Sequence, residues 1–343
     1  MKRINLISIV FFLLVSISLQ AKEKFTSTFK KEFEVNRDAT VQINNSFGDI
    51  QCFTWDENKV SIEVLVEVTA ENEKSASRIF DKISVEITGD KYKVVEQTKI
   101  NDINSRDAKF NIIVNVYLPE SLNLDFTNKF GNMYVGIVKG KTNLNQSFGT
   151  LQATELQNAD NEIMVQHGAL DLGIVKEAVI DIRHSDFNIE KADRLKVDAE
   201  FTAMEFEKIG KLFINANFGS LEIDEVGVIE CKLNGTNTSI DYLKESILAE
   251  CKLGELSIDN ISRGFSEVDI NGQHSSIKIG LENGASFSYD ISAQFASVYL
   301  PSNFKSSKEK VSFNSYKYYG NVGVKGSKAL IKIESQFGAI EIN

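Results

Sequence analysis

The stretch Ser147-Phe148-Gly149-Thr150-Leu151 carries the pattern that decides the fold of this 343-residue chain. Close copies occur at Ser46–Ile50 (SFGDI), Lys129–Met133 (KFGNM) and Gln336–Ile340 (QFGAI). Weaker copies fill the sequence between them. In each copy a first residue, usually aromatic, is followed by a small residue, and apolar residues come three and five positions after the first. Such internal repetition is typical of proteins in which short units stack along one axis.

Thirteen copies can be aligned. Their first positions are held by Phe47, Phe130, Phe148, His167, His184, Phe201, Phe218, Asn237, Leu253, His274, Phe295, Tyr319 and Phe337. The second position is Gly in eight copies and Ser185, Thr202, Thr238, Ser275 or Ala296 in the others. From Phe130 to Phe295 the copies are 16 to 21 residues apart. A near-constant length of this kind indicates a stacked unit, whereas recurring turns in a sandwich need no fixed spacing.

The apolar positions predict how a copy folds. Residues two apart share one face of a strand, so the third and fifth positions after the first point into one core. The small second position is expected to form a bend, because Gly tolerates backbone angles or a close approach that a Cβ would block. The predicted fold is therefore all-β: a single-stranded β-solenoid with rungs of about 17–21 residues. An antiparallel sandwich with recurring turns is the alternative.

The first copy precedes the second by 83 residues, and the sequence between them does not repeat. We expect residues 22–120 to form an N-terminal β-rich cap and residues 121–343 to form the β-solenoid repeats. The cap should hold one short helix within Ala70–Ile83 and strands at Val60–Val68, Ile83–Ile87, Tyr92–Val95 and Phe110–Leu118. At the other end the chain stops inside the last copy. That end could be covered by an earlier segment, by a partner or by nothing.

The N-terminus has the features of a secretory signal peptide, residues 1–21. Lys2 and Arg3 precede a mostly apolar run from Leu6 to Leu19, and Ala21 is a small residue at the expected cleavage site. An uncleaved N-terminal anchor is the alternative. No later stretch is apolar enough to span a bilayer, so we expect no stable transmembrane span after signal cleavage. The expected location is outside the cytoplasm, in the periplasm or at the cell surface.

Charge limits the choice of partner. Without residues 1–21 the chain keeps 36 Lys and Arg against 48 Asp and Glu, a net charge of −12. Such a balance argues against a nucleic-acid or anionic-lipid partner. An envelope protein or a glycan is the expected partner.

The histidines and cysteines are expected to be structural. His167, His184 and His274 all occupy the first position of a copy, where most copies have Phe, which indicates packing in a ladder of like residues. Cys231 and Cys251 lie in near-identical stretches about one copy apart, so a disulfide or two buried free thiols are both open. Cys52 is the third cysteine. We expect no catalytic, cofactor-binding or metal-binding residue, and no cofactor.

Carboxylates recur at outward positions of many copies. Those singled out are Asp49, Asp171, Asp186, Asp224, Asp241 and Asp259. Polysaccharide-cleaving β-helices place carboxylates in a cleft on one sheet, because glycoside hydrolysis needs a paired acid and base. A scattered distribution more often marks a solvated face.

Three features together resemble a known family: the Phe-Gly-x-Ile/Leu units, the Trp55–Val68 strand, and Leu118-Pro119 ahead of Phe130-Gly131. They are similar to the bacterial putative adhesin family, whose domain has no known function and some of whose members are encoded beside envelope-stress regulators. The resemblance spans Phe33 to the end of the chain. It implies a β-solenoid in the cell envelope with no established enzymatic activity, and it transfers no site residue. The chain has no lipoprotein cysteine after its apolar run.

Three functions are consistent with these observations. The leading hypothesis is a non-enzymatic binding or scaffold protein of the cell envelope. The alternatives are a carbohydrate-active β-helix enzyme and an accessory or sensor protein of an envelope-stress system.

Overall fold

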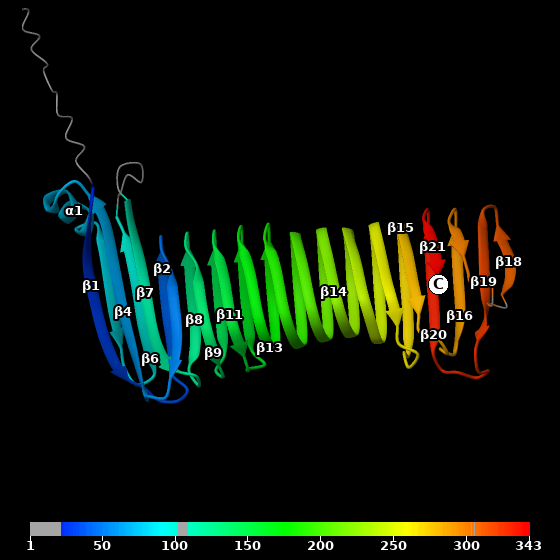
Figure 1. The fold of residues 1–343 in the computed structure, drawn as a ribbon, viewed down its shortest axis with the longest axis horizontal. Helices are drawn as coiled ribbons and strands as arrows, with labels where there is room; N and C mark the ends of the chain where they lie inside the picture. The colour runs from blue at the N-terminus through cyan, green and yellow to red at the C-terminus, as the bar shows by residue number, and fades with distance from the viewer. Residues whose placement is uncertain (1–21, 102–108, 303, 305) are drawn as a thin grey trace, which may run out of the picture.

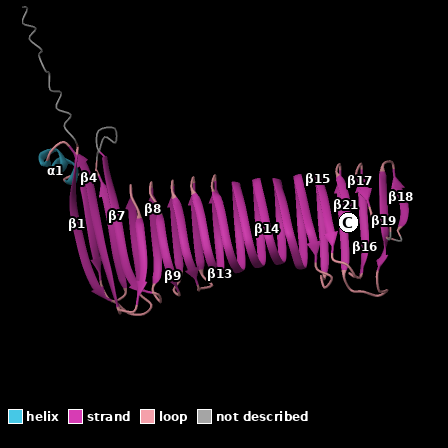
Figure 2. Ribbon diagram, in the orientation of Figure 1, coloured by secondary structure: helices cyan, strands magenta, loops and turns pink. Residues whose placement is uncertain are grey.

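The computed structural model describes residues 22–101, 109–302, 304 and 306–343. These residues form strands that lie side by side in one elongated row, with a single short helix near one end (Figure 1 and Figure 2). The prediction of an all-β fold with one helix is confirmed. The expected signal peptide lies outside the described residues. Within the described ranges, no helix is long and apolar enough to cross a membrane.

The N-terminal part contains seven strands and the helix. They are β1 (Glu23–Glu34), β2 (Thr40–Ser46), β3 (Ile50–Trp55), β4 (Lys59–Ala70), α1 (Glu73–Phe80), β5 (Ile83–Gly89), β6 (Lys93–Ile100) and β7 (Lys109–Pro119). Helix α1 begins after Asn72, whose side chain accepts a hydrogen bond from the backbone N–H of Ser75 at 2.9 Å. The predicted helix and the four predicted strands are present. Strand β1 was not predicted; it pairs antiparallel with β4 along its whole length.

The central part repeats one arrangement. Its strands are β8 (Asn123–Lys129), β9 (Met133–Val138), β10 (Thr142–Ser147), β11 (Thr150–Leu156), β12 (Asn161–Gln166), β13 (Ala169–Arg183) and β14 (Asp186–Ile261). Each copy contributes one segment before its first position and one after it. The leading segments pair in parallel, with Leu144 between Phe126 and Ile163. We call these segments the first stack.

The segments that follow the first position pair in the same way and form the second stack, with Leu151 between Met133 and Leu170. Alternate residues of both stacks are buried, including Leu144, Leu151 and Leu170, which are fully covered. Because like positions pair in register, equivalent side chains lie above one another along the row. The 76-residue strand β14 is the continuation of this arrangement through several copies.

The bend between the two segments differs from the expectation. The left-handed backbone conformation belongs to the first residue of the copy, with φ between 50° and 63° in eleven of the thirteen: Phe47, Phe130, Phe148, His167, His184, Phe201, Phe218, Leu253, His274, Phe295 and Phe337. The following Gly has no positive φ there. A Cβ at Gly149 would lie 1.9 Å from the carbonyl oxygen of Gly131 in the copy below. Close approach thus accounts for the Gly in these copies, whereas other copies fit Ser185, Thr202, Thr236 or Ser275 at the same position, and the first residue makes the bend.

Two assigned copies were wrong. Gly235, with φ 63°, occupies the bend that was assigned to Asn237. The hydroxyl of the next residue, Thr236, lies 3.2 Å from the carbonyl oxygen of Ala216. The Thr202 hydroxyl makes the equivalent contact in its own copy, 3.4 Å from the carbonyl oxygen of Ile182. Tyr319, the other exception, lies in an antiparallel strand and forms no bend of this kind.

The first copy joins the row directly. Strand β2 pairs with β8, and β3 pairs with β9, although 83 residues separate Phe47 from Phe130. On their other sides β2 pairs with β6 and β3 with β7. The hydrogen-bonded row therefore continues across residue 120, where the sequence suggested a boundary.

The C-terminal part has a different strand order. Its strands are β15 (Glu267–Leu281), β16 (Phe287–Gln294), β17 (Ser297–Tyr299), β18 (Ser307–Ser312), β19 (Ser315–Val322), β20 (Leu330–Gln336) and β21 (Ala339–Ile342). Strand β20 lies between β15 and β16, and β21 lies between β15 and β17. The last copy is thus covered by an earlier segment of the chain, which was one of the three possibilities. Antiparallel β18 and β19 follow on the outer side of β16.

Candidate functional site

The first positions of the copies form a row of stacked rings along one edge of the fold. We call this row the aromatic ridge; its members are Phe47, Phe130, Phe148, His167, His184, Phe201 and Phe218. Neighbouring ring centroids are 4.9–5.3 Å apart, and neighbouring planes differ by 4–27°. This spacing follows from the separation of hydrogen-bonded strands, about 4.8 Å, because each ring comes from the next strand in register.

The ridge is exposed to solvent. The phenylalanine members keep 39–49% of their surface accessible, from Phe47 to Phe201. His167 and His184 are exposed as well, and their planes differ by only 4°. The histidines therefore stack in the ladder as the sequence indicated, but the ladder lies on the surface and not in the core. Because the two faces of an inner ring are covered by its neighbours, each ring presents mainly its edge to solvent.

The ridge has a gap and a shorter second part. Gly235 offers no side chain, and the Phe218 ring occupies the space beside it: a Cβ on Gly235 would lie 2.7 Å from Phe218 Cδ1. Leu253 follows, 59% exposed. Beyond it His274, Phe337 and Phe295 stack in that spatial order, with centroid distances of 4.9 and 5.2 Å. The ridge and this shorter second part together contain aromatic rings from both ends of the described chain.

A shallow, open groove of about 590 Å³ runs beside the end of the ridge at Phe218. Its lining includes His184, Phe201 and Phe218 on the ridge side and Ser185, Asp186 and Ser220 beside them. At the other end of the ridge, the Lys129 ammonium lies 5.1 Å from the Phe130 ring centroid and 5.9 Å from that of Phe148. The surface is therefore apolar along its centre and polar along its sides, as protein-binding surfaces commonly are.

The outward face of the second stack is acidic. Glu155, Asp171, Glu190, Glu205, Glu207, Glu222 and Asp224 line an open groove of about 630 Å³. Of the six aspartates singled out in the sequence, Asp171 and Asp224 lie in this groove and Asp186 lies beside the ridge. Asp241 and Asp259 are exposed, and Asp49 accepts a hydrogen bond from the Asn132 backbone at 2.7 Å. The carboxylates of the groove are exposed except for half-buried Asp171 and Glu155.

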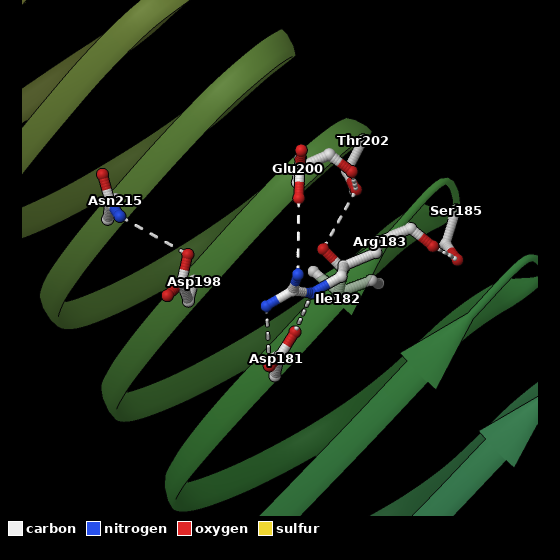
Figure 3. A network of polar contacts seen from close by, with 8 residues as sticks. All are labelled: Asp181, Ile182, Arg183, Ser185, Asp198, Glu200, Thr202 and Asn215. Atoms are coloured by element: carbon white, nitrogen blue, oxygen red, sulfur yellow. Dashed lines mark hydrogen bonds and ion pairs between the residues drawn. The ribbon is translucent and has the colours of Figure 1, made fainter.

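The outward face of the first stack carries a polar network (Figure 3). The Arg183 guanidinium bonds Asp181 on its own segment at 2.9 Å and reaches Glu200 of the next copy at 3.4 Å. Asn215 bonds Asp198 in the same manner at 3.4 Å. Pairs of this kind on exposed strands add little stability individually, but Arg183 offsets the negative charges of Asp181 and Glu200. Beside them Val179 and Leu248 remain about half exposed, in a groove of about 550 Å³.

The described residues offer no metal centre: nowhere in them do three or more His, Cys, Asp or Glu side chains gather to hold an ion. Cys52, Cys231 and Cys251 are buried free thiols. Counted from the bends, Cys231 lies four residues before Gly235, whereas Cys251 lies two before Leu253. The two cysteines therefore occupy different positions of their copies, and the apparent repetition of their surroundings did not reflect the structural register.

We expect the three thiols to be unreactive in the native protein. Burial raises the pKa of Cys52 and of Cys251 to about 12, and it raises the pKa of Cys231 well above its ordinary value. Because only the thiolate is a good nucleophile, native protein should react with Ellman's reagent far more slowly than protein unfolded in guanidinium. Unfolded protein should release three equivalents per chain. Rapid release of one equivalent from native protein would contradict this burial.

Comparisons with known proteins give remote structural similarity alone. No family model matches the sequence, and no curated protein does. Solved structures that match include a putative cell adhesion protein from Clostridium sporogenes, at 12% identity over 93% of this chain and 99% of that one, with a TM-score of 0.19. A putative adhesin from Parabacteroides distasonis matches at 10% identity over 75% and 93%, with a TM-score of 0.34. A putative lipid binding protein from the same species matches at 12% identity over 74% and 93%, with a TM-score of 0.30.

Proposed function

We propose that this chain is a non-enzymatic β-solenoid of the cell envelope that binds a protein partner along its aromatic ridge. The β-solenoid interpretation is supported by the parallel, in-register pairing of successive copies and by their recurrent left-handed bends. In this interpretation residues 22–120 cap one end and residues 121–343 form the repeats, with Thr40–Trp55 as an additional rung next to the cap. The chain is proposed to act in the periplasm or at the cell surface after export.

The exposed row of stacked rings is the observation that carries the proposed function. Monomeric soluble proteins rarely expose a long contiguous apolar surface unless that surface binds something. The left-handed conformation is unfavourable for a residue with a Cβ, by roughly 1–2 kcal/mol, so the phenylalanines occupy bends that Gly could form with less strain. The rings stack on one another, which offsets part of that cost. Their exposed edges then form one continuous contact surface, which is apolar except where His167 and His184 interrupt the phenylalanines.

The geometry of the ridge favours a protein over a glycan. Sugar-binding aromatic residues stack a ring face against the sugar, and here the faces of the inner rings are covered by neighbouring rings. For example, Phe148 has Phe130 on one side at 4.9 Å and His167 on the other at 5.0 Å. Ring edges instead suit the apolar side chains of another protein. A partner that follows the ridge would contact several equivalent rings in succession.

The proposal is tested by photo-crosslinking from the ridge. A photoreactive phenylalanine analogue at Phe148 or Phe201 should form protein adducts in intact cells that express the full chain. The same analogue at Tyr92, which is 70% exposed but lies away from the ridge, is the matched control and should form none of these adducts. Adducts whose added mass is lost on glycan digestion would indicate a glycan partner and contradict the proposed protein partner. Equal labelling from all three positions, or none, would contradict binding along the ridge.

The carboxylates of the acidic groove can be compared with those that the enzymatic alternative, a carbohydrate-active β-helix enzyme, would need. Glu190 and Glu207 occupy equivalent positions of neighbouring copies, both exposed. A glycoside hydrolase needs one carboxyl group held in an environment that favours its protonated form, which burial or an apolar neighbour usually supplies. The exposed carboxylates Glu190 and Glu207 lack burial of this kind. Purified protein is accordingly expected to release no reducing ends from envelope polysaccharides, and release that is abolished by Glu207→Gln would overturn the non-enzymatic proposal.

A further inference from the structure

The last segment of the chain occupies a position inside the row of strands. Residues 330–342 form β20 and β21, which separate β15 from the strands β16 and β17 that precede them in sequence. Figure 1 shows this segment, coloured red, between the yellow-orange β15 and the orange β16. The chain must therefore pass beyond this position, build β16 to β19, and return.

The strands on either side are in register with each other. Ile333 pairs with Ile270 on one side and with Ile291 on the other. Ile340 likewise pairs with Ile277 and with Val298. Residues that share a partner are thus 21 apart, which is also the spacing between the bends at Leu253 and His274. The register of β16 relative to β15 is therefore that of successive copies, with the last segment inserted between them.

The segment is held by contacts that any copy of the same sequence could provide. Its apolar residues Ile331, Ile333, Ile340 and Ile342 are buried, and Phe337 stacks between His274 and Phe295. Its covalent connection to the rest of the fold is residues 323–329, in which Gly323 and Gly326 have positive φ. In a molecule whose residues 330–343 are not in place, the position between β15 and β16 is open. The open position then presents two unpaired strand edges, which are surfaces that bind further strands.

We propose that the position between β15 and β16 accepts the C-terminal segment of a second copy of this chain, so that two or more molecules exchange residues 330–343. The exchanged segment would make the same parallel pairings and bury the same isoleucines as it does within one molecule. Exchange of identical elements needs no new interface, and its extent depends on protein concentration and on the connecting residues. This association is independent of what the aromatic ridge binds.

Exchange can be detected with one cysteine on each of two full-length chains. Lys278 pairs with Glu341 across β15 and β21, at a separation between neighbouring strands that suits a disulfide. A Lys278→Cys chain and a Glu341→Cys chain with different tags are mixed, refolded together and oxidised. A disulfide that joins the two tags is expected, because Cys at position 278 meets the last segment of the other chain. The native cysteines are buried, and the wild-type chain controls for their oxidation.

A matched control uses a pair that should not exchange. Asp171 and Asn188 hold the same outward position of two neighbouring central copies and pair in the same parallel manner. The Asp171→Cys and Asn188→Cys chains should therefore give no disulfide between tags. A double variant with Lys278→Cys and Glu341→Cys in one chain locks the segment internally and should prevent exchange.

Light scattering gives a readout that does not depend on cysteine geometry. Wild-type chain refolded at increasing concentration should show a rising dimer fraction, which the locked double variant should lack. The proposal would be overturned if the Lys278→Cys and Glu341→Cys chains gave no more product that joins the two tags than the Asp171→Cys and Asn188→Cys chains. Wild-type chain that stays monomeric at every refolding concentration would overturn it as well, whether or not the cysteine pairs oxidise. Substitutions in the ridge at Phe148 or Phe201 should leave exchange unchanged, which separates this test from that of the proposed function.

Discussion

Replacing Gly219 with valine is expected to lower the free energy of unfolding by about 3 kcal/mol or more. The backbone of Gly219 lies so close to the preceding copy that a Cβ would stand 2.0 Å from the carbonyl oxygen of Thr202 and 3.0 Å from its carbonyl carbon. These are backbone atoms of a paired strand, so the clash can be relieved only by a shift of one copy's backbone relative to the next. Denaturant unfolding of the variant, followed by far-UV circular dichroism, measures the loss.

A valine at Gly264 is the matched control for this substitution. Gly264 lies in an exposed turn, and the nearest atom to its added Cβ is the Ser262 hydroxyl oxygen at 3.8 Å. Neither Gly264 nor Gly219 has positive φ, so backbone strain does not distinguish them. The Gly264→Val variant should unfold within about 0.5 kcal/mol of wild type. Equal losses at the two sites would show that close approach between copies is not what requires the small residue.

The repeat pattern predicted where the bends lie better than it predicted their cause. A Phe-Gly pair suggested that Gly makes the turn, since Gly adopts left-handed conformations without strain. In the structure Phe148 has φ 55°, and Gly149 is needed because the carbonyl of Gly131 approaches it. Both requirements produce the same sequence pattern, namely a large residue followed by a small one that recurs along the chain. Only the backbone conformation separates them.

Two features of the fold, the bend at Gly235 and the position of Phe337, could not be predicted because the repeat pattern also fits other arrangements. Asn237-Thr238 and Gly235-Thr236 both offer a small second residue, but the residue three positions on is apolar Ile240 after Asn237 and polar Thr238 after Gly235, so the pattern favoured Asn237. The buried hydroxyl contact of Thr236 selects the second assignment. Similarly, the equal spacing of Leu253, His274 and Phe295 is compatible with direct stacking of successive copies, so it gave no indication that Phe337 lies between the last two.

The spacing of the repeats also could not predict that the aromatic ridge is exposed to solvent. A row of phenylalanines at one repeat position normally indicates a core ladder, because apolar residues at repeated positions are usually buried. The left-handed bend turns these side chains outward, away from the residues at the third and fifth positions. The histidines and phenylalanines share the ridge because both stack, and exposure makes the polar edge of a histidine acceptable there. The candidate site thus follows from backbone geometry combined with the pattern.

A second large effect is expected from pH, through Glu96 in strand β6. This residue is fully buried where β6 pairs with both β2 and β5. One carboxylate oxygen accepts a hydrogen bond from the Thr98 hydroxyl at 2.6 Å, and the other has no hydrogen-bond partner. Burial raises the pKa of Glu96 to about 7, against a weaker opposing effect of the bonds from Thr98 and the Asn44 backbone. The folded protein therefore favours the neutral carboxylic acid.

The direction of the pH effect follows from this raised pKa. Between the ordinary pKa of 4.5 and the folded value of about 7, the folded protein holds a proton that the unfolded chain has released. The free energy of unfolding should therefore fall as pH rises through this window, by about 3 kcal/mol in total, and stay lower above it. Glu96→Gln keeps the shape of the side chain without the charge. It should match wild type near pH 4 and exceed it by a similar amount at pH 8.

Glu86→Gln supplies the comparison, because Glu86 lies on the neighbouring strand β5 and is exposed. Removing an exposed carboxylate should shift the free energy of unfolding by less than about 0.5 kcal/mol and leave its pH dependence unchanged. Unfolding by urea at pH 4, 6 and 8 distinguishes the two variants. If Glu96→Gln kept the wild-type decrease between pH 4.5 and 7, the buried carboxylate would not be its source. If it removed the decrease, the junction between the N-terminal strands and the first copy would be the part of the fold whose stability responds to neutral pH.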